Sequence, residues 1–275
     1  SVFYSATPIV QKRHPNFDIK DEDKMSKEIL KIASEVQDYL NNGYDYFAKK
    51  FCNITKHRFD IKQEVIAKSG LFVTKKRYGL KIINDNGKKV NKMMVKGLDT
   101  VRSSFPSAMR DMLSKLLEDI LMDVPKDKLD KFIINFKNSM RLMDVDKISI
   151  PTGVKNIYKF IGKKNGQFSG YKKGAPVHVK ASIAYNDLLH FYKQDKKYEK
   201  ITNGSKVKWL YLKDNPLGLN VIAYKGYEDP PEIMKFIRDF INPSKLYKQA
   251  LEKKIMMFYE ALGWDEPTDA TKTIE

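Results

Sequence analysis

A block of β-type sequence at residues 62–95 lies between segments with helical periodicity, and this contrast constrains the fold more than any other feature. Short apolar runs rich in branched and aromatic residues alternate here with turn-forming sequence. Asp85-Asn86-Gly87 is a strong turn signal between the last two runs, because Asn and Gly accept positive φ angles. The pattern predicts an antiparallel hairpin or small sheet within an α+β chain. Its apolar residues are Val65, Ile66, Leu71, Phe72, Val73, Tyr78, Leu80, Ile82 and Ile83.

The sequence before this block predicts a strand followed by a helix. Residues 1–5 are apolar and aromatic, as in a buried strand, and Pro8 ends the run. Apolar side chains then recur at three- and four-residue spacing over residues 21–40, which predicts a helix. Acidic residues at 21–23 suit its N-terminus, and Gly43 is placed to end it.

Mostly helical sequence follows the block. Helices are predicted to begin at Pro106 and Pro125, because proline is favoured at helix starts. Two more are predicted at residues 231–241 and 243–262, with Asn242 as the N-cap of the second. The predicted core face after Pro106 consists of Met109, Met112, Leu113, Leu116, Leu117, Ile120 and Leu121. The face of the next helix consists of Leu129, Phe132, Ile133, Phe136 and Met140.

Two segments interrupt these helices. Residues 207–212 and 219–224 are short β runs on either side of Asn215-Pro216-Leu217-Gly218, which predicts a second hairpin. Residues 162–174 combine four glycines with four lysines, a composition typical of a basic, exposed loop rather than a regular element. The lysines are Lys163, Lys164, Lys172 and Lys173.

The charge balance indicates a polyanionic partner. The chain has 51 Lys and Arg against 34 Asp and Glu, a formal net charge of +17, which is typical of proteins that bind nucleic acid. A hydrophobic content of 42% excludes a disordered basic tail. Cys52 is the sole cysteine, which excludes an intrachain disulfide and fits a reducing cytoplasm. No apolar run reaches the roughly 18 residues of a membrane span, so no membrane partner is expected.

The sharpest local feature is the basic cluster Lys75-Lys76-Arg77-Tyr78, which lies inside a predicted strand. Such a cluster alone is more often a solvated strand face than a binding site. Its neighbours along the chain change this interpretation. Glu64-Val65-Ile66-Ala67 precedes it, and Lys96-Gly97-Leu98-Asp99-Thr100 and Arg102-Ser103-Ser104 follow it.

In this order and at about these distances, the segments resemble family B DNA polymerases, and most of all the T-even phage branch. In that family a Lys-Lys-Arg-Tyr strand of the palm faces the minor groove of the primer-template, and a Gly-Leu-Asp or Gly-Leu-Glu turn leads into the thumb. Weaker matches continue in order along nearly the whole chain. They are Ser149-Ile150, Asn156-Ile157, Pro176 to Lys180 with His178, Tyr185-Asn186, Lys206-Val207, Asn215-Pro216 with Gly218, and Glu252-Lys253-Lys254.

The resemblance implies a C-terminal palm piece at residues 1–99, followed at residues 100–275 by a mixed, mainly helical thumb with a C-terminal helical tail. It implies that the chain grips primer-template duplex DNA through phosphate contacts that carry no sequence information. Tyr78 can pack against a sugar or base edge, while Lys76 and Arg77 reach acceptors common to all base pairs. The predicted DNA-binding residues are Lys75, Lys76, Arg77, Tyr78, Lys163, Lys164, Lys172, Lys173, His178 and Lys180.

The resemblance also implies that the active site is completed elsewhere. The second metal-binding motif of the family reads Tyr-Gly-Asp-Thr-Asp-Ser, and Ser1 resembles its last residue. We therefore expect no catalytic residue and no metal ligand in this chain, and Mg²⁺ only in the complete polymerase. The expected partner is the N-terminal polymerase portion with its exonuclease, palm and fingers. A split gene and a truncation both explain such a fragment, and the implied location is the cytoplasm of an infected bacterium.

A short apolar and aromatic segment follows Glu252-Lys253-Lys254 near the C-terminus. T-even type polymerases end in such a segment, which docks in a pocket of the sliding clamp. The polar residues 265–275 depart from this pattern, and the same spacing would place the apolar side chains against the thumb. Clamp binding and packing therefore both remain open. The residues concerned are Met257, Phe258, Leu262 and Trp264.

Two other functions compete with the polymerase interpretation. The chain could be a non-catalytic duplex DNA- or RNA-binding accessory protein that uses the same scaffold. Asp144 and Asp146 could form half of a hydrolase metal site, but a loop or cap role is the more ordinary one for such a pair. The four histidines show no spacing typical of a zinc site or a catalytic dyad.

Overall fold

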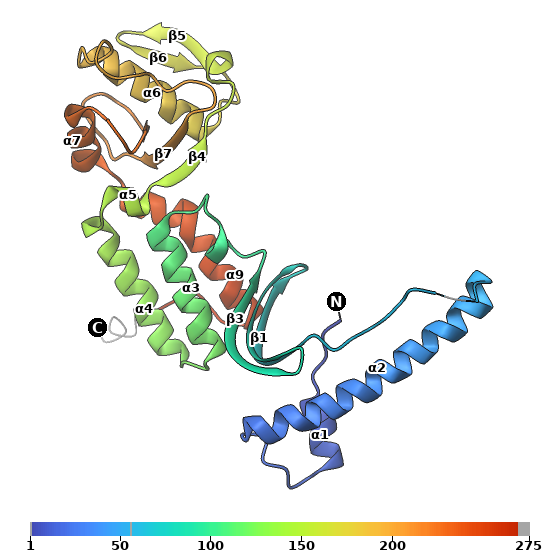
Figure 1. Ribbon diagram of the computed structural model, residues 1–275. Helices are drawn as coiled ribbons and strands as arrows, with labels where there is room; N and C mark the ends of the chain where they lie inside the picture. Colours follow the sequence, from blue (N-terminus) through green and yellow to red (C-terminus); the bar gives the residue numbers. More distant parts are fainter. Residues whose placement is uncertain (1, 56, 269–275) are drawn as a thin grey trace. The chain divides into compact units, whose positions relative to one another are not determined.

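The computed structural model describes residues 2–55 and 57–268, and it divides into two compact units. The first unit comprises Ser1–Gly70 and Gly79–Met94, and the second comprises Leu71–Tyr78 and Val95–Glu275. Helices and small antiparallel sheets occur together, which confirms the predicted α+β class (Figure 1). Ser1 and residues 269–275 lie outside the described residues, so the interpretation of Ser1 as the end of a metal-binding motif stays a prediction.

Two helices, α1 (Thr7–Arg13) and α2 (Glu22–Cys52), build the first part of the first unit. The side chain of Asp21 caps α2 by accepting the backbone N–H of Lys24 at 3.0 Å, as the acidic start predicts. A small core holds α1 against α2. It consists of Val10, Met25 and Ile32 with Phe17, Ile29 and Val36 around it.

The strand predicted at residues 1–5 is wrong. Residues 2–6 form no strand, and Val2 is 85% exposed. An apolar run becomes a strand only where its backbone groups pair with a neighbouring strand. None of the three sheets in the described part of the chain includes these residues.

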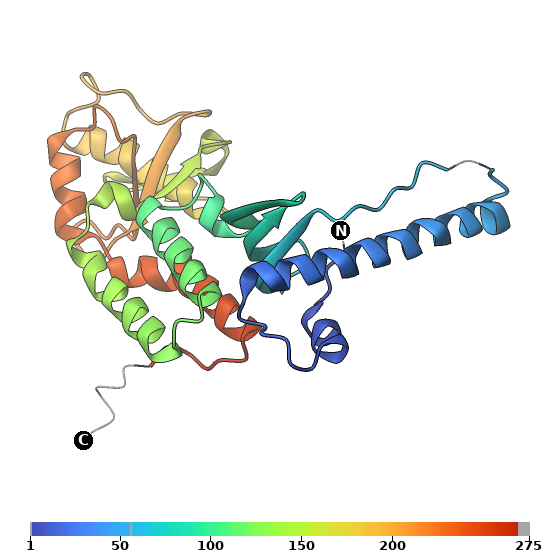
Figure 2. The same ribbon diagram turned by 60° about the horizontal axis from the view of Figure 1, so that its bottom comes forward.

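Helix α2 does not end at Gly43, which corrects a second prediction. It continues to Cys52, and Asn53 ends it in the left-handed conformation with φ 50°. Glycine inside a helix costs only about 1 kcal/mol, so a single glycine does not by itself end a helix. The side chain of Asn41 holds both the N–H and the C=O of Ile61, at 2.9 and 3.1 Å, and that segment runs alongside α2 (Figure 2).

The β-type block forms a three-stranded sheet, as predicted. Its strands β1 (Val65–Thr74), β2 (Arg77–Asp85) and β3 (Lys88–Lys96) lie in the order β1-β2-β3. Asn86 and Gly87 form the turn between β2 and β3 with φ angles of 50° and 82°. The buried Asn84 side chain fixes this turn by accepting the Gly87 N–H at 2.9 Å.

Helices dominate the second unit, and Pro106 and Pro125 precede the first two as predicted. The whole predicted face of the first of them is buried. The helices are α3 (Ser107–Leu121), α4 (Lys126–Ser139), α5 (Val145–Ile148), α6 (Val177–Phe191), α7 (Pro231–Phe240), α8 (Pro243–Leu246), η4 (Tyr247–Glu252) and α9 (Lys253–Ala261). Asn242 caps helix α8, which continues through the π-helical segment η4 into α9. Short 3-10 turns are η1 (Asp99–Val101), η2 (Met140–Leu142) and η3 (Ile157–Phe160).

A second antiparallel sheet has the order β4-β7-β8, and helix α6 packs on it. Its strands are β4 (Ile150–Gly153), β7 (Lys206–Tyr211) and β8 (Val221–Tyr224). Strands β7 and β8 pair with Trp209 opposite Ala223, which confirms the hairpin predicted around Asn215-Pro216-Leu217-Gly218.

The basic segment 162–174 is largely a β-hairpin rather than the predicted loop. Strands β5 (Ile161–Asn165) and β6 (Phe168–Tyr171) pair antiparallel. Asp187 on α6 accepts both the N–H and the hydroxyl of Ser169, at 2.7 and 2.9 Å. Asp187 is 18 residues from Ser169 along the chain. The glycine and lysine content of residues 162–174 therefore did not indicate these contacts.

Candidate nucleic-acid interface

Lys75 and Lys76 form the turn between β1 and β2, which corrects their predicted place inside a strand. Both side chains are exposed, and Lys76 has a positive φ of 63°. A non-glycine residue in this region is uncommon and costs of order 1 kcal/mol, so neighbouring contacts must hold it. The two charges therefore sit at the tip of a tight turn rather than along a strand face.

Gly97 lies directly against this turn. Its φ is 67°, and a Cβ added here would clash with the carbonyl oxygen of Lys76. Only glycine fits both the conformation and the close approach. This contact brings the basic cluster and the Lys96-Gly97-Leu98-Asp99 segment together in the folded chain.

Arg77 points into the second unit rather than freely to solvent. Its Nε donates to the Gly97 carbonyl at 3.1 Å, and its guanidinium lies 3.3 Å from the Asp99 carboxylate. It also approaches the Met257 sulfur at 4.0 Å, and its side chain is 27% exposed. Arg77 thus helps to hold the turn, and the direct DNA contact predicted for it stays a prediction.

Tyr78, the last residue of the cluster, is half-buried. Its ring lies 5.6 Å from the ring of Phe72 across the β1–β2 pair. We call the group of Lys75, Lys76 and Tyr78 the turn surface, and Arg77 packs behind it.

A second basic surface lies on hairpin β5–β6 and the start of α6. Lys163, Lys164, Lys172 and Lys173 are all exposed, and we call this group the hairpin surface. Lys180 lies 5.9 Å from the centre of the Tyr171 ring. The sequence from Lys147 to Asn186 contains no Asp or Glu, a charge signal that does not depend on any motif. Within this stretch the local charge is therefore positive, and the nearest carboxylate described above is Asp187, which is bonded to Ser169.

His178 lies on the first turn of α6 and is half-buried. Burial lowers the pKa of the His178 imidazole below its usual value, which favours the neutral form at pH 7. A neutral ring can donate or accept a hydrogen bond but does not form an ion pair with phosphate.

The predicted clamp-binding segment packs largely within the second unit. Phe258 is only 3% exposed, and Met257 faces Arg77. Trp264 is half-buried and meets the buried Tyr259 ring edge-on at 5.4 Å. The Tyr259 hydroxyl donates to Asp130 at 2.7 Å, and burial raises its pKa. These contacts favour the packing role over an exposed partner site.

Asp144 is a helix cap, as the sequence favoured, and Asp146 lies in the first turn of α5. Asp144 caps α5 by accepting the Asp146 N–H at 2.8 Å. The Asp146 carboxylate accepts from the Tyr224 hydroxyl at 2.8 Å and from Lys208 at 3.0 Å. No group of three or more His, Cys, Asp or Glu suited to a metal ion occurs among the described residues.

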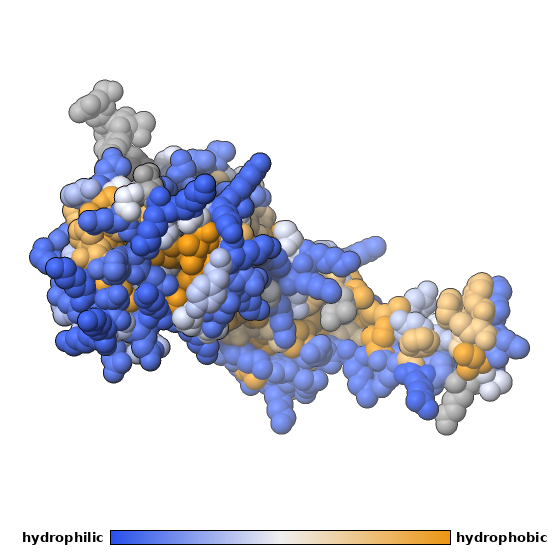
Figure 3. All heavy atoms as spheres, turned by 90° about the horizontal axis from the view of Figure 1, so that it is seen from above, coloured by the Kyte–Doolittle hydropathy of each residue, from blue (hydrophilic) through white to orange (hydrophobic). Residues whose placement is uncertain are grey.

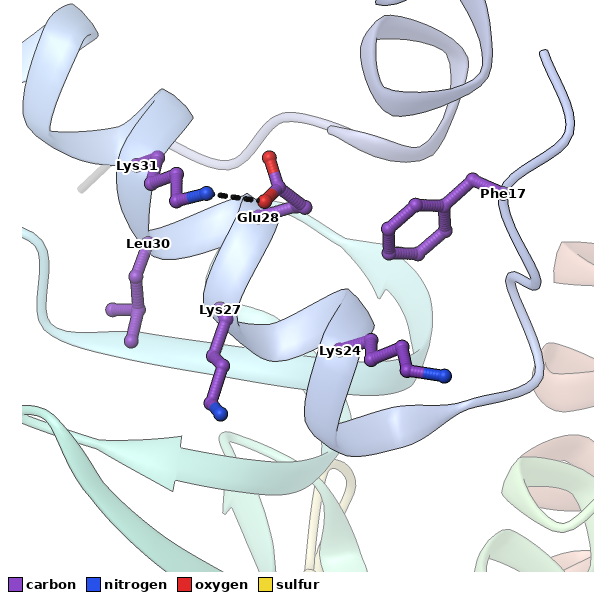
Figure 4. A pocket seen from close by; sticks show the side chains of 6 residues that line it. All are labelled: Phe17, Lys24, Lys27, Glu28, Leu30 and Lys31. Carbon is purple, nitrogen blue, oxygen red and sulfur yellow. Dashed lines mark hydrogen bonds and ion pairs between the residues drawn. The ribbon is translucent and has the colours of Figure 1, made fainter. Parts of the chain in front are cut away.

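An open hollow of about 450 Å³ lies in the first unit beside α2 (Figure 4). Glu28 and Lys31 in its lining pair with each other at 2.5 Å, so part of its charge is already neutralised. It gives no site for chemistry. Its lining residues are Phe17, Lys24, Lys27, Glu28, Leu30 and Lys31.

Hydrophilic side chains cover most of the face drawn in Figure 3, with apolar patches between them. No helix within the described ranges is long and apolar enough to cross a membrane. A net charge of +17 and two exposed lysine surfaces on an α+β chain are typical of proteins that bind nucleic acid. Residues 23–262 match the model of DNA polymerase family B, so the chain belongs to this family.

Curated relatives agree with this family. The chain is 25% identical over 254 residues to the DNA-directed DNA polymerase of Enterobacteria phage T4, covering 88% of this chain and 26% of that polymerase. It is 26% identical over 270 residues to the DNA-directed DNA polymerase of Escherichia phage RB69, covering 92% of this chain and 28% of that polymerase. A DNA polymerase of Methanocaldococcus jannaschii is 29% identical over 127 residues, covering 46% of this chain and 7% of its own length. The chain therefore spans about a quarter of the length of the phage relatives.

Proposed function

We propose that this chain supplies the part of a DNA-directed DNA polymerase that grips primer-template duplex beside an active site completed by the N-terminal portion. The observation that carries the proposal is the turn surface, where Gly97 and Arg77 hold two exposed lysines in a fixed place. In this proposal residues 1–99 are the end of the palm and residues 100–275 are the thumb.

A polymerase must hold every sequence while the product slides through, and phosphate contacts satisfy this requirement. Lysines displace condensed counterions without reading bases, so they give affinity that is independent of sequence. The hairpin surface supplies four further exposed lysines for the same purpose. Tyr78 is half-buried and can offer only part of its ring or its hydroxyl to a sugar or base edge.

The chemistry of nucleotide transfer belongs, in this proposal, to the remaining polymerase portion with its exonuclease, palm and fingers. Two Mg²⁺ ions held by aspartates of that portion would stabilise the attacking and leaving oxygens. The residues of this chain bind and orient the duplex. The proposed setting is the cytoplasm of an infected bacterium, and a sliding clamp is a further candidate partner.

An extension assay tests the proposal. The purified chain with primer-template, Mg²⁺ and nucleotides is expected to extend no primer, whereas adding the N-terminal polymerase portion is expected to give extension. The measurement is primer lengthening on a denaturing gel.

Two controls make the assay decisive. The N-terminal portion alone should extend the primer less than the mixture does, since the duplex grip is missing. Robust synthesis by the chain alone would contradict the proposal, and an inactive mixture that still binds duplex would favour the DNA- or RNA-binding accessory protein.

A further inference from the structure

One buried carboxylate forms ion pairs with three basic side chains from different parts of the second unit. Asp99 is 7% exposed, and its Oδ2 lies 3.3 Å from Arg77 and 2.9 Å from Lys254. Its Oδ1 lies 3.0 Å from Arg102. Arg77 begins β2, Arg102 follows η1, and Lys254 lies in α9, so three elements meet at one side chain.

The partners of Asp99 also hold the turn surface. Arg77 bonds to Asp99 and to the Gly97 carbonyl, and the backbone of Gly97 lies against Lys76. The Asp99 carboxylate fixes the planar guanidinium from one side, since charge-assisted bonds are the strong, directional ones. Asp99 is therefore connected to the tip of the turn through Arg77 and Gly97.

We propose that Asp99 is a positioning residue for DNA binding, which holds the Lys75-Lys76 turn in the conformation that contacts phosphate. This inference rests on the proposed function and assigns a role to a residue that does not itself meet DNA. Asp99 acts through Arg77 and Gly97, and Lys254 ties the same carboxylate to the C-terminal helix.

Positioning and simple electrostatics predict opposite results for the same substitution. Asp99→Asn removes a negative charge beside a polyanion site, so electrostatics alone predicts equal or tighter DNA binding. If Asp99 positions the turn, the same substitution weakens binding, because the turn lysines lose their fixed place. The sign of the change therefore separates the two explanations.

The experiment measures duplex affinity of the full chain by fluorescence anisotropy with a labelled primer-template. At about 0.1 M salt, loss of one phosphate contact lowers affinity about tenfold, and Asp99→Asn is expected to show at least this loss. Asp111→Asn is the matched control, because Asp111 is exposed on α3 and its loss changes net charge equally. It should leave affinity unchanged or slightly raise it. Asp99→Glu should restore most of the binding.

A second variant keeps the test valid if Asp99→Asn does not fold. Arg77→Lys preserves the charge but loses the Nε bond to Gly97, so it should weaken duplex binding and speed amide hydrogen exchange at residues 75–77. Asp99→Asn or Arg77→Lys binding as tightly as the wild-type chain would overturn the inference. A wild-type chain that binds no duplex would instead overturn the proposed function, so the two failures are distinguishable.

Discussion

Phe258→Ala is expected to lower the free energy of unfolding by about 3–5 kcal/mol, the usual cost of removing a buried phenylalanine ring. Phe258 is 3% exposed, and the helix that carries it packs against α3. The truncation therefore leaves a cavity rather than a bare surface. Urea denaturation followed by circular dichroism measures the change.

Tyr158→Ala is the matched control for this substitution. Tyr158 is an aromatic residue of the same unit but 62% exposed, so its loss should change stability by less than about 0.5 kcal/mol. If Phe258→Ala retained wild-type stability and instead weakened binding to a sliding clamp, the packing role assigned to this segment would be wrong.

The double substitution Lys75→Ala and Lys76→Ala is expected to weaken duplex binding by roughly 10- to 100-fold at about 0.1 M salt. Both lysines are exposed at the tip of the β1–β2 turn, so their removal takes away two phosphate contacts without disturbing a core. Unrelated DNA sequences should lose affinity by similar factors. The slope of log affinity against log salt should flatten by about two units.

Lys196→Ala with Lys197→Ala removes the same charge from another exposed part of the second unit and provides the control. Its effect on affinity should be small, because these lysines belong to neither the turn surface nor the hairpin surface. Equal losses from both pairs would show that net charge alone, rather than the turn, determines binding.

Local patterns predicted much of the second unit. The buried residues of α3 are those that the three- and four-residue spacing indicated, and proline marks the start of α3 and α4. Asn242 caps the last helix for the same local reason, since a side-chain oxygen can accept an N–H three residues ahead.

The wrong predictions share a different cause. Helix α2 passes Gly43 next to Asn41, which bonds to the distant Ile61, and Asp187 on α6 bonds to Ser169 in hairpin β5–β6. Such contacts override local propensity and cannot be read from a short window of sequence.

The sequence predicted the motifs of the candidate site but not the contacts between them. The resemblance indicated the basic cluster and the Gly97 and Asp99 segment, yet it gave no contact between them. Arg77 is 22 residues from Asp99, and Lys254 is 155 residues away from it, so the ion pairs depend on the folded chain. For the same reason the contacts of Arg77 with Gly97 and Asp99 were not predicted, and its DNA contact stays a prediction.

A salt titration of wild-type binding to two unrelated primer-templates shows whether this chain grips duplex DNA through phosphate contacts. Two turn lysines and four hairpin lysines imply about six phosphate contacts, and thus a log-log slope of roughly −5. We expect this steep slope with nearly equal affinities for both sequences. A flat salt dependence, or tight binding of one sequence alone, would contradict it.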